Sequence, residues 1–152
     1  MVKVMATGTF DLLHLGHIYY LKEAKKLGDK LAVVVATDVT VRKLKHEPVN
    51  NENTRVNLIK ELKIVDEAYL GYEEDMYEIV DEIKPDIIAL GFDQIHDENK
   101  IKTELKKRNI SSKVIRLSEF QGGSDLEGTR RIISKIISAY EFQKDMERIE
   151  GK

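Results

Sequence analysis

The sequence contains no cysteine and no tryptophan, and its 152 residues carry a net charge of only −2. Without cysteine, the chain has no disulfide bond, thiolate nucleophile or thiolate-bound zinc. The small net charge gives no bulk attraction to nucleic acid or to an acidic membrane, so we expect neither as a partner. No run of about 18 apolar residues predicts a membrane-spanning helix, and the amino terminus lacks a signal-peptide pattern. We therefore expect a cytoplasmic protein whose ligand sites are built from a few placed groups.

Apolar residues make up 41% of the chain, enough for the core of one domain. Short apolar runs predict five strands, at residues 2–6, 31–36, 67–70, 86–90 and 113–117. Helical patterns separate them, at residues 18–27, 39–45, 54–62, 76–83 and 101–108. A polar loop at 122–125 precedes a last helix that begins at about residue 126. This alternation predicts an α/β Rossmann-like domain with helices on both faces of a five-stranded parallel sheet in the order 3-2-1-4-5.

We assign residues 1–140 to this domain and residues 141–152 to the charged end of the last helix, which we expect to fray. The chain is organised around residues 8–17, Gly-Thr-Phe-Asp-Leu-Leu-His-Leu-Gly-His, which join the first strand to the first helix. At such a junction, unpaired backbone N–H groups and the positive helix end favour a phosphate. His14 and His17 add side-chain donors there. A metal site is the alternative, with Asp11 as a third ligand.

The glycine at position 8 and the His-x-Gly-His pattern at 14–17 resemble the signature loop of a nucleotidyltransferase superfamily, the cytidylyltransferase-like family. The resemblance extends over most of the chain. Residues 39–45 and 84–94 are similar to the archaeal FAD synthetases, which implies transfer of AMP from ATP to FMN, giving FAD and pyrophosphate. The alternative is a CTP-dependent cytidylyltransferase acting on glycerol-3-phosphate or another small phosphate. A nucleotide-binding module without activity is a third hypothesis, against which the intact histidine pair argues.

The resemblance also implies roles for individual residues. We expect His14, His17 and Lys43 to be catalytic, with the two imidazoles donating to phosphate oxygens as negative charge builds. We expect the acceptor to be bound by Asp11, Lys45 and Arg55. The predicted nucleotide-binding residues are Thr9, Phe10, His14, Leu15, Gly16, His17, Asp93, Thr129 and Arg130.

Three further expectations concern partners and one departure from the family pattern. We expect a divalent cation, Mg²⁺, as cofactor, and we assign it no protein ligand. Dimers are common among similar proteins, so we expect a homodimer. Gly128 stands where the family usually has serine, at the phosphate-binding start of the last helix. Backbone N–H groups, Thr129 and the arginine that follows it remain available for an anion there.

Overall fold

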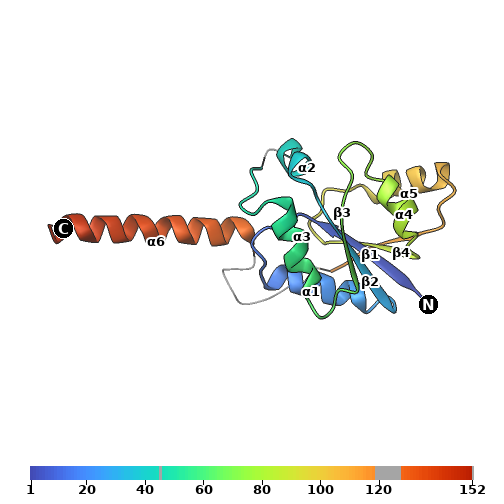
Figure 1. Ribbon diagram of the computed structural model, residues 1–152, viewed down its shortest axis with the longest axis horizontal. Helices are drawn as coiled ribbons and strands as arrows, with labels where there is room; N and C mark the ends of the chain where they lie inside the picture. Colours follow the sequence, from blue (N-terminus) through green and yellow to red (C-terminus); the bar gives the residue numbers. More distant parts are fainter. Residues whose placement is uncertain (45, 119–127, 152) are drawn as a thin grey trace.

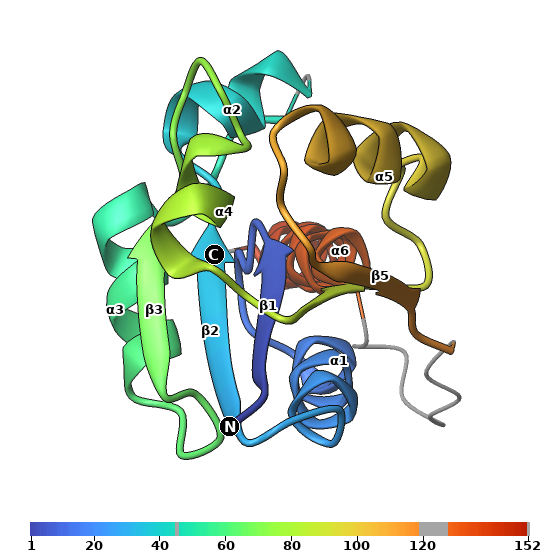
Figure 2. The same ribbon diagram turned by 90° about the vertical axis from the view of Figure 1, so that its right-hand side faces the viewer.

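The computed structural model describes residues 1–44, 46–118 and 128–151, and within them it confirms the predicted sheet (Figures 1 and 2). Five parallel strands lie in the order β3-β2-β1-β4-β5. Their bounds are β1 Lys3–Gly8, β2 Lys30–Val35, β3 Glu67–Leu70, β4 Ile87–Leu90 and β5 Lys113–Arg116. The helices are α1 Leu15–Lys25, α2 Asp38–Lys43, α3 Glu52–Lys60, α4 Glu78–Ile83, α5 Glu98–Lys107 and α6 Thr129–Ile149.

The two central strands are buried on both faces, and the alternation of their side chains divides the core in two. Val4 of β1 and Val33 of β2 point to a cluster shared with α1 and α3. Met5 and Val34, one residue further along each strand, point to a second cluster shared with α4 and α5. Continuous β-branched runs suit strands covered by helices on both sides. The helices in Figure 2 cover the two faces accordingly.

Capping residues explain why several helices begin before their predicted starts. α5 begins at Glu98 instead of residue 101 because the Asp97 carboxylate accepts hydrogen bonds from two backbone N–H groups of the first turn. Asn51 caps α3 in the same way, so α3 starts at Glu52. α1 begins at Leu15, which places His14 at its amino-terminal cap. The predicted signature loop is therefore also a helix start.

α6 projects from the body of the protein as one long helix (Figure 1). It is helical through residues 141–149, where we expected fraying. The predicted loop at 122–125, the predicted helix start at 126 and Lys45 lie outside the described residues. The division at residue 140 stays a prediction.

Candidate active site

The sheet opens between β1 and β4, at the point where the strand order reverses. The two strands pair from Val4 to Ala6, whereas β1 stays paired with β2 as far as Gly8. Beyond Ala6, the backbone groups of Thr7 are hydrogen-bonded by side chains instead of by β4. Its N–H donates to the Tyr20 hydroxyl at 3.2 Å, and its carbonyl accepts from the Gln94 amide at 2.6 Å. Ligands of open α/β sheets bind at such a switch point, so we expect the active site in the crevice between β1 and β4.

Tyr20, which falls within the helical pattern at residues 18–27, bridges two strands of the sheet. Its hydroxyl lies 2.7 Å from the Ala89 carbonyl of β4 and also contacts Thr7 of β1, so it bridges the strands where they part. Burial is the main cause that raises the pKa of Tyr20 far above its ordinary value, so the hydroxyl stays protonated and can donate. Sequence reasoning missed this role because nothing in the helical pattern separates a bridging tyrosine from a packing one.

The loop after β1 holds two residues in a backbone conformation that L-residues rarely adopt. Phe10 has a φ of +53° and Leu12 a φ of +51°. Asp11 lies between them, 8% exposed, and its carboxylate accepts the backbone N–H groups of Val49 at 2.6 Å and Asn50 at 3.0 Å. The predicted contact of Asp11 with the acceptor is not tested by these contacts and stays a prediction. The carboxylate fastens this loop to residues 49–50 instead of facing open solvent.

Arg55 is fully buried, and its predicted contact with the acceptor also stays a prediction. Its guanidinium donates to the carbonyls of Asn50 at 2.9 Å, Thr9 at 2.9 Å and Ala36 at 2.7 Å, and to the Asp38 carboxylate at 2.7 Å. That last hydrogen bond is the main cause that lowers the pKa of Asp38. Arg55 thus joins three loops at the carboxyl ends of β1 and β2, and a cation at a helix start is explained by these partners.

Four rings form a column behind the loop. The rings of His14 and His17 stack with centroids 3.7 Å apart. Phe10 meets the His17 ring edge-on at 5.4 Å and stacks on Tyr20 at 6.3 Å. A Cβ added at Gly8 would lie 2.9 Å from the Phe10 ring, so only glycine leaves room for this column. The column fixes where the two imidazoles lie.

The two histidines cap α1 reciprocally, and this sets their tautomers. His14 Nδ1 accepts the Gly16 N–H at 3.1 Å, and His17 Nδ1 accepts the His14 N–H at 3.3 Å. A neutral imidazole that accepts at Nδ1 carries its proton at Nε2. Burial, and secondarily the neighbouring His14, lowers the pKa of His17 to about 3. At neutral pH, His17 is therefore an uncharged hydrogen-bond donor through Nε2.

The first turn of α6 reaches the same loop. The Thr129 hydroxyl donates to the Asp11 carbonyl at 2.6 Å. Arg130 lies 3.0 Å from Nε2 of His46, just before the segment that Asp11 holds. The structure therefore brings Thr129 to the loop that carries His14 and His17, although they are more than 100 residues apart in the sequence, and places Arg130 beside His46.

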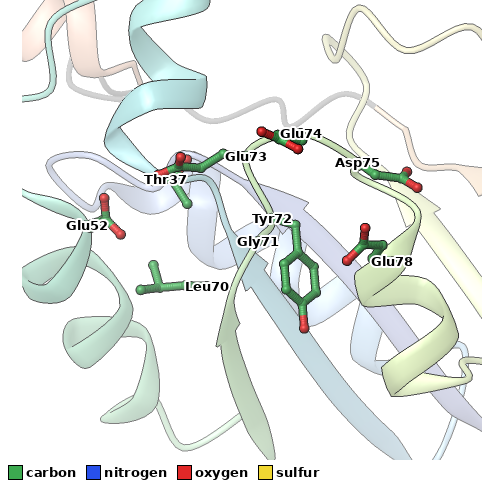
Figure 3. A pocket seen from close by; sticks show the side chains of 9 residues that line it. All are labelled: Thr37, Glu52, Leu70, Gly71, Tyr72, Glu73, Glu74, Asp75 and Glu78. Atoms are coloured by element: carbon green, nitrogen blue, oxygen red, sulfur yellow. The ribbon is translucent and has the colours of Figure 1, made fainter.

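Lys43 lies elsewhere, beside an acidic hollow at the ends of β2 and β3. Its ammonium donates to the Glu73 carbonyl at 3.2 Å. The hollow measures about 450 Å³, and Figure 3 shows its lining: Thr37, Glu52, Leu70, Gly71, Tyr72, Glu73, Glu74, Asp75 and Glu78. Five carboxylates around one space repel a phosphate. The described contacts do not join Lys43 to the histidine loop, and its predicted catalytic role stays a prediction.

A second arginine organises the loop after β4. The Arg116 guanidinium donates to the carbonyls of Gly91 and Gln94, both at 2.9 Å, and to the Glu98 carboxylate at 2.7 Å. Asp93, the predicted nucleotide contact, is exposed on this loop. Sequence reasoning assigned no role to Gln94 or Arg116. The available signal was a cation directly after the apolar pair Val114 and Ile115 at the end of the strand.

The Cytidylyltransferase-like family matches this chain over residues 5–149. The chain belongs to that family. A protein of Aciduliprofundum boonei named FAD synthase is 56% identical over 137 residues, which cover 90% of this chain and 91% of that protein. A FAD synthase of Methanobrevibacter ruminantium is 55% identical over 147 residues, covering 95% and 97% of the two chains. The resemblance inferred from the signature loop is thereby confirmed.

Solved structures agree on the fold. A crystal structure from Thermoplasma volcanium, titled a lipopolysaccharide core biosynthesis protein, matches with a TM-score of 0.78 and 55% identity. The match covers 80% of this chain and 99% of that one. A pantoate-beta-alanine ligase from Francisella tularensis has a TM-score of 0.57 at 19% identity, which shows the fold alone. Among the helices that the structure describes, none combines the length and apolarity that a membrane crossing needs.

Proposed function

We propose that this member of the family is an FAD synthase that transfers AMP from ATP to FMN and releases pyrophosphate. The observation that carries the proposal is the reciprocally capped pair His14 and His17, which presents Nε2–H donors at the switch point of the sheet. The substrates are supported by the FAD synthases that are 56% and 55% identical over most of their own length.

In this reaction a phosphate oxygen of FMN attacks the α-phosphorus of ATP, and the bond to the pyrophosphate oxygen breaks. The protein has no bond to form, so its task is alignment and stabilisation of the charge that builds on the phosphate oxygens. The uncharged His17 imidazole, held by the helix cap, can donate without reorganising in the transition state. Before the triphosphate binds, burial holds the pKa of His17 at about 3, so the imidazole is uncharged at neutral pH.

The remaining site residues either contact the substrates or position the residues that do. We assign the nucleotide to backbone and side chains at Thr9, Phe10, Leu15, Gly16, Asp93, Thr129 and Arg130. Arg55 and Asp11 act as positioning residues, since both are buried and bonded to the loops that carry these contacts. Lys43 and Lys45 are left as the proposed cations for the acceptor. The acidic hollow beside Lys43 favours an uncharged part of the acceptor over its phosphate.

We propose Mg²⁺ as the cofactor. The described residues contain no group of three or more His, Asp or Glu side chains that fits a metal ion. Mg²⁺ in nucleotide enzymes is held largely by substrate phosphates and water. Bound together with ATP, the ion would be held by the triphosphate and water and would shield the phosphate charge.

We also propose that the enzyme is a homodimer in the cytoplasm. Support for a second copy comes from α6, none of whose residues is buried although several are large and apolar.

The test is a pyrophosphate-release screen with product identification. FMN and ATP with Mg²⁺ should give FAD and pyrophosphate in equal amounts. CTP with glycerol-3-phosphate, run in parallel, should give none. FAD absent with every divalent cation tried, or turnover with CTP alone, would overturn the proposal. If the protein bound nucleotide but turned over no acceptor, it would be a nucleotide-binding module without activity.

A further inference from the structure

α6 is exposed over most of its length, with Thr129, Ile132 and Ile133 partly buried, and yet is amphipathic. It lies clear of the sheet and of the other helices (Figure 1). None of its 21 residues is buried. Its large exposed apolar side chains are Ile136, Ile137, Tyr140, Phe142, Met146 and Ile149. An isolated helix of this length is only marginally stable in water, and packing of an apolar face supplies most helical stability in proteins. Such a face marks an interface.

Five of the apolar positions of α6 have a palindromic spacing, whereas Ile133, Ile137, Tyr140 and Ile149 lie outside this set. Ile132, Ile136, Ala139, Phe142 and Met146 are separated by four, three, three and four residues. At about 100° per residue these five positions fall within an arc of about 120°, so they share one face. The series reads the same in both directions about Ala139. A second, antiparallel copy would set Ile132 opposite Met146 and Ile136 opposite Phe142.

The distribution of charge along α6 also favours the antiparallel arrangement. Residues 129–140 contain three basic side chains and no acidic one. Residues 141–150 contain four acidic and two basic side chains, a net charge of −2. Two parallel copies would place like charges beside each other, whereas two antiparallel copies place the basic half of each helix beside the acidic half of the other.

We propose that α6 pairs with α6 of a second copy of this chain, antiparallel, with the twofold axis passing at Ala139. This interface rests on the homodimer proposed above and gives it a geometry. The contact is self-complementary, so it closes as a dimer and does not propagate. Thr129 ties the first turn of α6 to Asp11 of the histidine loop. The acidic half of the partner helix therefore lies at the edge of each active site.

Introduced cysteines test the geometry without background, because the chain has none of its own. Under mild oxidation, Ala139→Cys should give a disulfide-linked dimer, since only a residue at the axis meets its own copy. Ile132→Cys and Met146→Cys should each stay unlinked alone and crosslink when mixed. Lys144→Cys, on the opposite side of the helix, is the matched control and should stay unlinked in every mixture.

Sedimentation of the unmodified protein completes the test. A dimer that weakens as salt is raised supports the pairing. A monomer, or a dimer in which Ile132→Cys self-crosslinks as readily as Ala139→Cys, overturns it. A dimer without the Ala139→Cys crosslink overturns this interface but leaves the homodimer standing. The FMN and ATP assay on the same samples is independent, so failure of the reaction and failure of the helix pair are distinguishable.

Discussion

Two arginines hold the two loops that meet at the crevice, and they differ in burial. Arg55, on α3, joins the loop after β1 to its neighbours and has no exposed side-chain surface. Arg116, at the end of β5, joins the loop after β4 to Glu98 with 28% of its side chain exposed. Both donate to several backbone carbonyls and one carboxylate. The same kind of arginine-centred hydrogen-bond network therefore occurs once in the buried interior and once in a partly exposed position.

This difference predicts two different kinds of loop. Removing a buried, bonded cation leaves its partners desolvated and unpaired, whereas an exposed ion pair contributes little because water replaces it. The loop after β1, which carries His14 and His17, should be a rigid platform. The loop after β4, which carries Asp93, should tolerate change and adjust to the nucleotide.

The largest effect on stability is expected for Arg55→Met. It leaves the carbonyls of Thr9, Ala36 and Asn50 and the Asp38 carboxylate without their donor. We expect the free energy of unfolding in urea to fall by about 3–5 kcal/mol. Arg116→Met is the matched control, and equal losses in the two variants would contradict the comparison of the two loops.

The next effect concerns catalysis. His17→Asn keeps an acceptor near the Nδ1 position for the His14 N–H but has no donor at Nε2. We expect kcat to fall about 100-fold or more, which corresponds to about 3 kcal/mol, with cooperative unfolding retained. Asp93→Asn, on the loop after β4, should change kcat far less. Normal turnover by a folded His17→Asn protein would refute the role of the imidazole.

The pH dependence of the unfolding free energy should also distinguish the loop after β1 from the loop after β4. The folded pKa of His17, about 3, lies below its ordinary value of 6.5. The unfolded chain therefore binds more protons between these values, and the contribution of His17 is present above pH 6.5 and lost as the pH falls. At about pH 4.5 the loss should reach roughly 2–3 kcal/mol. Urea unfolding at several pH values measures it, and His17→Asn should remove it.

His96 supplies the control on the other loop. Burial, and secondarily Arg116, lowers its pKa, so its contribution is lost in the same direction on acidification. His96→Asn should remove a smaller part of the acid sensitivity than His17→Asn. If His96→Asn removed more of the acid sensitivity than His17→Asn, the loop after β4 would be the more rigid of the two.

The smallest effect is expected for Arg116→Met. Its guanidinium is partly hydrated, so the unfolding free energy should fall by about 1 kcal/mol or less. The loop after β4 loses its anchor, so we expect the KM for ATP to rise a few-fold with kcat nearly unchanged. Steady-state kinetics with FMN in excess measures the two constants. A large fall in kcat would show that this loop is as rigid as the other.

Residue types and their periods were enough to predict the fold. Short β-branched runs such as residues 31–36 favour covered strands, and short connections with right-handed crossovers leave few strand orders. The histidine pair was also identifiable, because two donors around a glycine at a strand-to-helix junction are a local feature. Helix starts were less predictable, since the cap depends on which neighbouring side chain turns back to the backbone, as Asp97 does.

Long-range polar bonds were what sequence reasoning could not assign. Arg55 and Asp11 have the charge of ligand-binding residues, and nothing local shows that their partners are backbone groups 5 to 46 residues away. Burial decides between the two roles, and burial of a charged side chain depends on which loops fold over it. The same reason hides Tyr20 and Gln94, which bond to Thr7 from 13 and 87 residues away along the chain.

The sequence by itself determined the parallel sheet, the helix that follows residues 8–17 and the two imidazoles at its start, because period and spacing are properties of the chain alone. Only the tertiary structure decided which polar groups face a ligand and which support it. That choice is made by desolvation: a charge enclosed by packed loops must be bonded within the protein, and enclosure exists only once the loops have come together.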